Sequence, residues 1–472
     1  MKRSTKNILI LLTAAAMLTA MIPAGVFAAD DYGIWFCGKK VTSKNMSGPG
    51  WSFDLSKFTL KLNGFSYSGA DVVSHADDGT DYYSAIFCSG GPQLTISLSG
   101  KNTIALKGVP DDNTIIYALA SGADLTFTGN GSLDITTDPI SGSNTGIWAK
   151  GSLTMNGGTV HVATGGGKSS VPVDCGRELR INKGSLQLET GPAEYPIALW
   201  CDGNMTMTGG SVSAVCGNIE QSGQKDEDNR YSYGIRIKNS LFIDGGEIYA
   251  KSGDTGTSGE QLSMGLVAMQ DMIINGGAIT AESGVSNAQS VGCACMGNFF
   301  MSAGELTAVG NGVSGIFASS SGTLKMPTTV RTFGLLLNSR QAMVSIDGGT
   351  VTAKAGNART ALGISTALRA NSSISINGGT VTAETDDMGD QNIGMDIQGS
   401  LSIGKNVKKL VASGTKAAVS GTLISGIKGA GYSDMAGKKD KTTVGGGAPL
   451  QDPTYKKLQF PEPRSFSFSK DK

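Results

Sequence analysis

A short phrase recurs along the middle of the chain, and it restricts the folds that the chain can adopt. Each copy has two or three alternating apolar positions, a turn of the Asn/Asp-Gly-Gly type and a second alternating stretch, as in Leu153–Val160, Leu241–Ile248 and Ile374–Val381. The second glycine of the turn, or its equivalent, occupies positions 131, 158, 184, 210, 246, 277, 304, 349 and 379. Alternation with a period of two is typical of strands, and a unit that returns at this spacing indicates a stack of similar coils.

Each repeat also contains an upstream strand, which often opens with glycine, as at Gly146, Gly234, Gly265, Gly292 and Gly394. A stack of hairpins is the first alternative, because Asn-Gly pairs often form two-residue hairpin turns. The unit, however, has three strands in an unchanged order, and an odd number of strands disfavours hairpins. The sequence therefore predicts an all-β fold, a single-stranded right-handed parallel β-helix with three short strands per coil and about 12 coils.

Composition agrees with this fold class and excludes others. Of the 472 residues 68 are glycine and only 13 are proline, and the glycines have no three-residue period, which excludes collagen. The chain holds 39 basic and 39 acidic residues, so it lacks the excess positive charge with which proteins bind nucleic acid. Nucleic acid is therefore not an expected partner.

The first residues are typical of an export signal. Lys2, Arg3 and Lys6 precede the apolar stretch Ile8–Ile22, and Val26-Phe27-Ala28 resembles a cleavage site. This stretch is short for a membrane anchor, the alternative interpretation, and no later stretch could cross a bilayer. We therefore predict a signal peptide at 1–28 and a secreted protein, extracellular or at the cell surface, with no membrane span in the mature chain.

The remaining chain is expected to form one long stack. The repeat pattern predicts an N-terminal cap region at 29–85, the parallel β-helix at 86–428 and a C-terminal cap at 429–460. Residues 461–472 are expected to be a disordered tail.

The inward positions of the first strand in each repeat are apolar and hold most of the cysteines. The predicted inward pairs are Ile147/Ala149, Val173/Cys175, Leu199/Cys201, Ile235/Ile237, Leu266/Ala268, Cys293/Cys295 and Met395/Ile397. We expect buried free thiols. A disulfide between Cys175 and Cys201 is the alternative, since adjacent coils would place their Cα atoms about 5 Å apart.

The outward positions of the same strand contain the candidate binding residues. Trp148 and Trp200 are predicted to lie two coils apart, roughly 10 Å, which is similar to the length of a disaccharide repeat. Exposed aromatic rings flanked by carboxylates and cations suit stacking on sugars and hydrogen bonding to hydroxyl or uronate groups. The predicted glycan-binding residues are Trp148, Asp174, Trp200, Asp202, Arg236 and Lys238. The alternative is that the two tryptophans only cover the strands or lie under a loop.

The sequence contains no motif for catalysis or for a metal site. The two histidines, His75 and His161, have no evident partners and are interpreted as bystanders. The Asn and Asp residues before Gly-Gly are assigned to the turn, where such side chains bond their own backbone. They are Asn156, Asp244, Asn275, Asp347 and Asn377. Calcium on the Asp members is the one cofactor to consider, and no catalytic residue is predicted.

Three stretches resemble a group of known proteins. They are Tyr32–Thr42, the repeat unit Ile374–Ala383 and the ending Tyr455–Phe460. All three resemble secreted proteins of clostridial and other Gram-positive bacteria, described as carbohydrate-binding-domain or pectate-lyase-like parallel β-helix proteins. The resemblance implies a secreted or surface polysaccharide binder, with calcium as an option.

We therefore expect a secreted, non-catalytic β-helix that binds an extracellular or cell-wall polysaccharide or acts as an adhesin. A β-helix lyase or hydrolase acting on an acidic glycan is the main alternative. Asp174, Asp202, Arg236 and Lys238 are the only charged groups on one face that could serve it. The third interpretation is a structural surface rod that binds protein.

Overall fold

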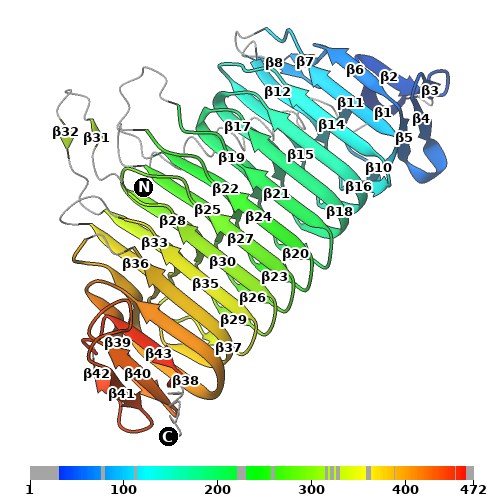
Figure 1. Cartoon of the computed structure of the whole chain (residues 1–472). Coiled ribbons are helices and arrows are strands. Elements are labelled where there is room, and N and C mark those ends of the chain that lie inside the picture. Colours follow the sequence, from blue (N-terminus) through cyan, green and yellow to red (C-terminus); the bar gives the residue numbers. More distant parts are fainter. Residues whose placement is uncertain are drawn as a thin grey trace, which may run out of the picture.

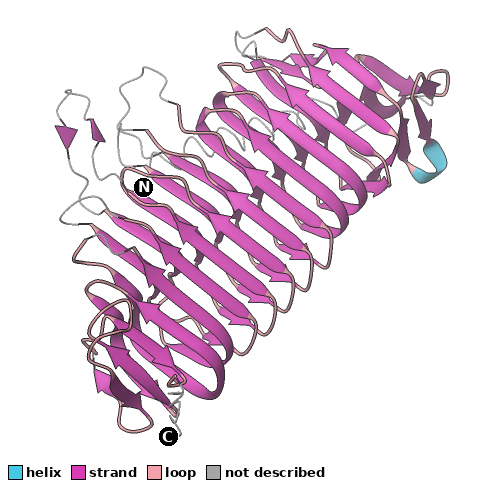
Figure 2. Cartoon of the chain, in the orientation of Figure 1, coloured by secondary structure: helices cyan, strands magenta, loops and turns pink. Residues whose placement is uncertain are grey.

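The chain forms a β-solenoid of about ten turns, in which successive coils stack through parallel strands (Figure 1). The computed structural model describes residues 31–75, 80–110, 114–220, 230–256, 261–313, 317–318, 324–325, 330–357, 363–386, 389–451 and 453–463. In these ranges the one helix is the three-residue 3₁₀ turn η1 (Leu55–Lys57), and strands dominate (Figure 2). The predicted all-β parallel fold is confirmed. The structure has about ten turns, where about 12 were expected, and antiparallel strands pair at both ends.

The first of the three sheets carries the opening strand of every coil, and we call it the first sheet. Its members pair in parallel register from each coil to the next. Its strands are β8 (Asp81–Tyr83), β9 (Ile86–Cys88), β12 (Thr114–Ser121), β15 (Ser143–Ala149), β17 (Gly167–Cys175), β19 (Ala193–Cys201), β22 (Tyr231–Ile237), β25 (Leu262–Ala268), β28 (Gln289–Cys295), β33 (Arg331–Leu337), β36 (Ile364–Ala370) and the first parts of β38 (Ile393–Ser413) and β39 (Ala417–Ser425).

The second sheet carries short strands that precede the glycine turn. Its strands are β5 (Thr59–Asn63), β10 (Leu94–Ser99), β13 (Leu125–Gly129), the starts of β16 (Leu153–Thr164) and β18 (Leu179–Thr190), β20 (Met205–Met207), β23 (Leu241–Ile243), β26 (Met272–Ile274), β29 (Phe299–Met301), β34 (Val344–Ile346), the start of β37 (Ile374–Thr385) and later parts of β38 and β39.

The third sheet follows the glycine turn and completes each coil. Its strands are β6 (Ser66–Gly69), β11 (Lys101–Leu106), β14 (Ser132–Thr137), the ends of β16 and β18, β21 (Ser211–Val215), β24 (Glu247–Lys251), β27 (Ala278–Glu282), β30 (Glu305–Gly310), β35 (Thr350–Ala355) and the ends of β37 and β38.

Antiparallel strands occupy the two ends of the stack. The N-terminal group is β1 (Asp31–Phe36), β2 (Lys39–Thr42), β3 (Ser47–Gly48), β4 (Trp51–Asp54) and β7 (Val72–His75); the C-terminal group is β40 (Lys428–Tyr432), β41 (Thr442–Gly445), β42 (Leu450–Gln451) and β43 (Lys457–Phe460). β4 pairs with β5, and β43 pairs with β38 and β40. These pairings cover strand edges that would otherwise be open to another chain. Two further strands, β31 (Phe317–Ala318) and β32 (Leu324–Lys325), pair only with each other.

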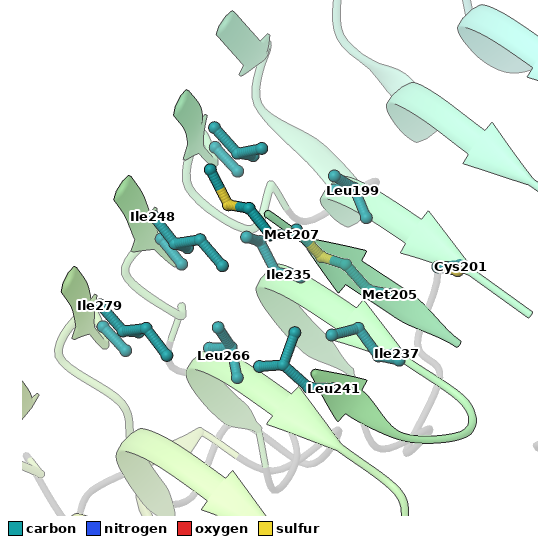
Figure 3. Packing of buried hydrophobic residues seen from close by; sticks show 14 of the residues in the cluster. Leu199, Cys201, Met205, Met207, Ile235, Ile237, Leu241, Ile248, Leu266 and Ile279 are labelled. Carbon is teal, nitrogen blue, oxygen red and sulfur yellow. The ribbon is translucent and has the colours of Figure 1, made fainter. Parts of the chain in front are cut away.

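Side chains from the three sheets meet in one narrow core. In Figure 3, Leu199, Ile235 and Leu266 of the first sheet approach Met205 and Leu241 of the second, and Ile248 and Ile279 of the third. All the predicted inward pairs of the first sheet are buried. Identical positions in successive coils therefore form continuous apolar columns.

The glycine turns have the backbone conformation that their composition predicts. The second glycine has a φ of 71° to 89° at 158, 184, 210, 246, 277, 304, 349 and 379, a region that favours glycine. A Cβ on Gly277 would also lie 2.6 Å from the carbonyl oxygen of Gly246. Both the turn conformation and the close approach of neighbouring coils require glycine here.

The Asn and Asp residues of these turns bond one another rather than their own backbone, which corrects our expectation. The Asn275 amide donates to Asp244 at 2.9 Å, and the Asn377 amide donates to Asp347 at 2.7 Å. Stacking brings equivalent turns within hydrogen-bond distance, so that a ladder between coils replaces the local bond. The two carboxylates are thus engaged by neighbouring amides.

The cysteines are free thiols, as the preferred interpretation predicts. Cys175 and Cys201 lie in register and fully buried, and their thiols donate to the carbonyl oxygens of Glu178 and Arg177, each at 3.3 Å. The alternative disulfide between them is not formed. The hydrogen bond with Cys201 and burial raise the pKa of the Cys175 thiol.

Two expectations fall outside the described residues. The predicted signal peptide at 1–28 is one, and most of the predicted tail, from 464 onward, is the other. Within the described parts of the chain, no helix is long and apolar enough to cross a bilayer.

Candidate functional site

The outer side of the first sheet carries a column of equivalent residues, one from each coil, which contains most of the predicted binding residues. Strand pairing connects Trp148 to Asp174, Asp174 to Trp200, Trp200 to Arg236 and Arg236 to Val267. The same column continues to Arg369 and Asp396. We call it the outer column. Column residues from adjacent coils are about 4.8 Å apart along the solenoid.

Glycine in the middle of β22 is required by the close approach of neighbouring backbone. A Cβ on Gly234 would lie 2.4 Å from the oxygen of Gly265 and 2.8 Å from the nitrogen of Lys251 in the third sheet, so a larger residue does not fit. On the outer side of the same strand, the ring of Tyr233 lies 5.8 Å from the Arg236 guanidinium. The outer side of β22 therefore presents a compact group of side chains rather than an isolated residue.

Trp148 is buried, which corrects the prediction that it presents an exposed stacking surface. It is 5 % exposed and packs in a cluster with Tyr82, Phe87 and Tyr117, its ring 5.6 Å from that of Tyr117. Aromatic side chains of the two preceding coils fill the space around it. Trp148 therefore belongs to the packing of the outer face, and the predicted pair of stacking tryptophans is not formed.

Trp200 is partly exposed and is held from two sides. The Arg236 guanidinium of the next coil lies 4.2 Å from its ring, and its indole nitrogen donates to Asp202 at 3.1 Å. Asp202 in turn pairs with Lys238 at 3.3 Å, and this lysine is 56 % exposed. The structure thus brings Trp200, Asp202, Arg236 and Lys238 into one connected group.

Asp174 lies between Trp148 and Trp200 in the outer column. Part of the residue reaches solvent, but burial of its carboxyl group, together with the Asp202 carboxylate, raises the pKa of Asp174 to about 7. Near neutral pH this side chain therefore exists both as a hydrogen-bond donor and as an acceptor.

Three tyrosines that we did not predict complete the site. The ring of Tyr231 lies 5.6 Å from that of Tyr195 and 5.0 Å from that of Tyr233, and all three residues are partly exposed. The preceding Arg230 is buried, lies 3.8 Å from Glu194 and donates to the Glu220 carbonyl. Tyrosine at alternate positions before a glycine, as in Tyr231-Ser232-Tyr233-Gly234, is the signal that could have located them.

We call this partly exposed group on β17, β19 and β22 the platform. It comprises Asp174, Tyr195, Trp200, Asp202, Tyr231, Tyr233, Arg236 and Lys238. The strands β17, β19 and β22 are successive in the first sheet (Figure 1), and Asp202 and Lys238 directly follow β19 and β22.

Hydrogen bonding on the platform is incomplete. In the described part of the chain, Nη1 of Arg236 is a buried platform atom without a hydrogen-bond partner; outside the platform the same holds for the hydroxyl groups of Ser169, Thr332 and Thr366. Ser169 lies in register with Tyr195. Buried polar atoms normally have partners, and an unpaired one costs about 1–3 kcal/mol. Arg236 therefore has one donor for an acceptor that the described chain does not provide.

His161 is not isolated, which corrects its interpretation as a bystander. On the outer side of the third sheet its Nδ1 lies 2.7 Å from Asp134, and its Nε2 lies 3.9 Å from Glu189. The side chain of the other histidine, His75, lies outside the described residues. Across the described ranges, no group of three or more His, Cys, Asp or Glu residues is placed to hold a metal ion.

These observations define a β-solenoid repeat protein with a partly exposed aromatic and charged platform on the outer side of its first sheet. Residues 79–309 match the model of a family described as "Carbohydrate-binding domain-containing protein". The matched range contains every platform residue. No curated protein and no solved structure matches the chain.

Proposed function

We propose that the platform binds a polysaccharide and that the protein does not catalyse a reaction on it. The observation that carries this proposal is the combination of partly exposed aromatic rings with the unpartnered donor of Arg236. Sugars offer apolar ring faces together with many oxygen acceptors, and this combination matches both features. The carbohydrate-binding description of the family that matches residues 79–309 supports the same ligand class.

The chemistry of each group suits this role. Tyr195 and Tyr231 offer ring surfaces, since one face of Trp200 is occupied by the Arg236 guanidinium. Because Nη1 of Arg236 is buried, contact with a ligand oxygen requires a rotation of this partly exposed side chain. Asp202 and Lys238 at the rim contribute one acceptor and one donor.

A glycan array probed with the full chain tests this proposal. We expect binding to one class of polysaccharide, and we expect Trp200→Ala and Tyr231→Ala to weaken it at least about tenfold, which corresponds to about 1.4 kcal/mol. Tyr249→Ala is the matched control, because Tyr249 is a partly exposed tyrosine of the third sheet that donates to Glu282. Binding that both platform variants retain would place the ligand elsewhere on the solenoid.

Hydrolysis of the bound glycan is the second candidate function. Asp174, with a pKa raised to about 7, and the nearby Asp202 are the kind of unequal carboxyl pair that glycosidases use. Release of reducing or unsaturated ends from a bound polysaccharide, lost in Asp174→Asn, would replace the binding proposal by this one.

We also propose that the protein is exported and acts outside the cell, on an extracellular or cell-wall polysaccharide. The signal-like residues 1–28 and the resemblance to secreted clostridial-type and pectate-lyase-like β-helix proteins support this localisation. Fractionation of cells that express the full chain tests it: we expect the protein in the medium or wall fraction, shortened at its N-terminus by about 28 residues.

A further inference from the structure

The platform is bounded at both ends along the solenoid by packed side chains. On the N-terminal side, β15 presents Trp148, 5 % exposed, against Tyr117 of β12, which is equally buried. On the C-terminal side, β25 presents Val267, 1 % exposed, and Met264. The apolar cluster there continues through Val291, Ala294, Phe333 and Leu336 of β28 and β33.

The C-terminal boundary differs from the platform in chemistry as well as in exposure. On β25 the outward residues Leu262, Met264 and Val267 have no side-chain nitrogen or oxygen atom, whereas every platform residue has one. A sugar hydroxyl placed over Val267 or Met264 loses contact with water and finds no partner, which is unfavourable. The partly exposed aromatic and polar surface of the platform therefore ends at β25, and on the other side it ends at β15, where Trp148 is buried.

The length of this restricted region follows from the strand spacing. Three successive strands span two spacings of about 4.8 Å each, roughly 10 Å between the outermost strand axes. One spacing is close to the length of one sugar unit in an extended chain. The platform consequently has room for one unit over each strand.

We propose that the platform, if it binds glycans as proposed above, takes a short segment of about three sugar units, such as a chain end or a side branch. We call the packed side chains at the two boundaries, Trp148 of β15 and Met264 and Val267 of β25, the closed regions. Sugar units beyond the short segment make no favourable contact with them. The protein thereby distinguishes short accessible segments from long chains laid along a surface, and the closed regions act as specificity-determining elements on either side of the site.

Isothermal titration calorimetry with oligosaccharides of defined length tests this inference on the full chain. Cello-, xylo- and galacturono-oligosaccharides of one to six units are the probes, so that neutral and acidic sugars are both represented. In the series that binds, we expect affinity to rise about tenfold or more from one to three units and to change less than about twofold from three to six. Affinity that keeps rising to six units would overturn the short-segment proposal and leave the binding function intact.

Two further outcomes separate this inference from the function on which it rests. No binding of any series, with no binding on the glycan array, contradicts the proposed function itself. A plateau at three units that Trp200→Ala leaves unchanged in affinity overturns the inference, because the short site is then not the platform. A plateau whose affinity falls in Trp200→Ala, but not in Tyr249→Ala, supports it.

Discussion

Two arginines at equivalent positions of the first sheet have opposite surroundings. Arg369 on β36 faces Asp396 in the next coil, with which it forms an ion pair, and its Nε donates to Asn371 at 3.2 Å. Arg236 on β22 faces Val267 in the next coil, and its Nη1 has no partner in the described chain. The same column therefore contains one arginine that is satisfied by the protein and one that is not.

The contrast extends to the residues around each arginine. Near Arg369, Asp396 also accepts from Gln398, and Asn371 donates to Asn338, so polar groups of successive coils form a closed network. Near Arg236, the guanidinium lies on the ring of Trp200, and the neighbouring tyrosines are partly exposed. Packing of the solenoid accounts for the first arrangement. The second leaves hydrogen-bonding capacity unused, and this is the physical reason to regard it as a binding site.

The largest expected effect separates the two tryptophans of the outer column. Trp148→Ala removes a buried ring from an aromatic cluster and should lower the free energy of unfolding by about 3 kcal/mol, with glycan affinity per folded molecule nearly unchanged. Trp200→Ala should lower the free energy of unfolding by about 1 kcal/mol only and weaken glycan binding. Urea unfolding and calorimetric titration measure the two quantities. If folded Trp148→Ala lost glycan binding instead of stability, this would contradict the assignment of Trp148 to packing and of Trp200 to the binding platform.

The next effect concerns the arginines themselves. Arg369→Ala leaves the buried Asp396 carboxylate without its cation and should destabilise the protein by about 2 kcal/mol, without changing glycan affinity. Arg236→Ala should leave stability within about 1 kcal/mol and reduce affinity about tenfold. Equal losses of affinity in the two variants, after correction for the folded fraction, would show that Arg236 contacts the ligand no more than Arg369 does.

A smaller and more specific effect is expected when Arg236 receives the partner that Arg369 already has. Val267→Asp places a carboxylate opposite Arg236 in the register that Asp396 occupies opposite Arg369. This carboxylate competes with the ligand for the guanidinium, so we expect glycan affinity to fall about fivefold. Val267→Asn has a similar shape without the charge and should lose less. Double-mutant analysis with Arg236→Ala supplies the control: the effect of Val267→Asp should then largely disappear.

Periodicity predicted which residues face the core, because in a strand the side of the sheet alternates with a period of two. The inward positions of the first sheet, including Cys175 and Cys201, are buried as predicted. The turn glycines were predictable too, since the Asn/Asp-Gly-Gly turn requires a positive φ. Both properties are local or repeat in every coil.

Periodicity did not predict which outward residues reach solvent. Trp148 and Trp200 occupy the same position of the repeat, but only Trp148 is covered, because Tyr117 and the aromatic residues near it belong to that part of the stack. Covering of this kind depends on side chains one or two coils away, which the repeat pattern of a single coil does not reveal. The hydrogen bond between His161 and Asp134 could have been predicted, because the two residues are 27 positions apart, a typical repeat length.

The smallest expected effect is that of replacing Asp174. It tests whether this buried carboxyl group of the platform lowers the free energy of unfolding. Burial and Asp202 raise its pKa from 3.8 to about 7 in the folded protein. Because the folded pKa is the higher one, the stabilising contribution of the protonated form is complete below the unfolded pKa. It is lost as the pH rises through about 7.

Asp174→Asn removes this pH-dependent term. At pH 8 we expect the variant to be more stable than the natural chain by about 1 kcal/mol, a value reduced for the partial exposure of the residue. At pH 4 the advantage should vanish, because Asp174 is then protonated in the folded protein. Thermal unfolding at both pH values measures the difference, and Asp271→Asn is the matched control: Asp271 is a partly exposed aspartate that accepts a hydrogen bond from the backbone N–H of Asn298 at 2.7 Å, so its replacement should bring no gain at pH 8. A gain in Asp174→Asn that is equal at pH 4 and pH 8 would instead reflect packing. The raised pKa of Asp174 would then not distinguish the platform from the closed regions.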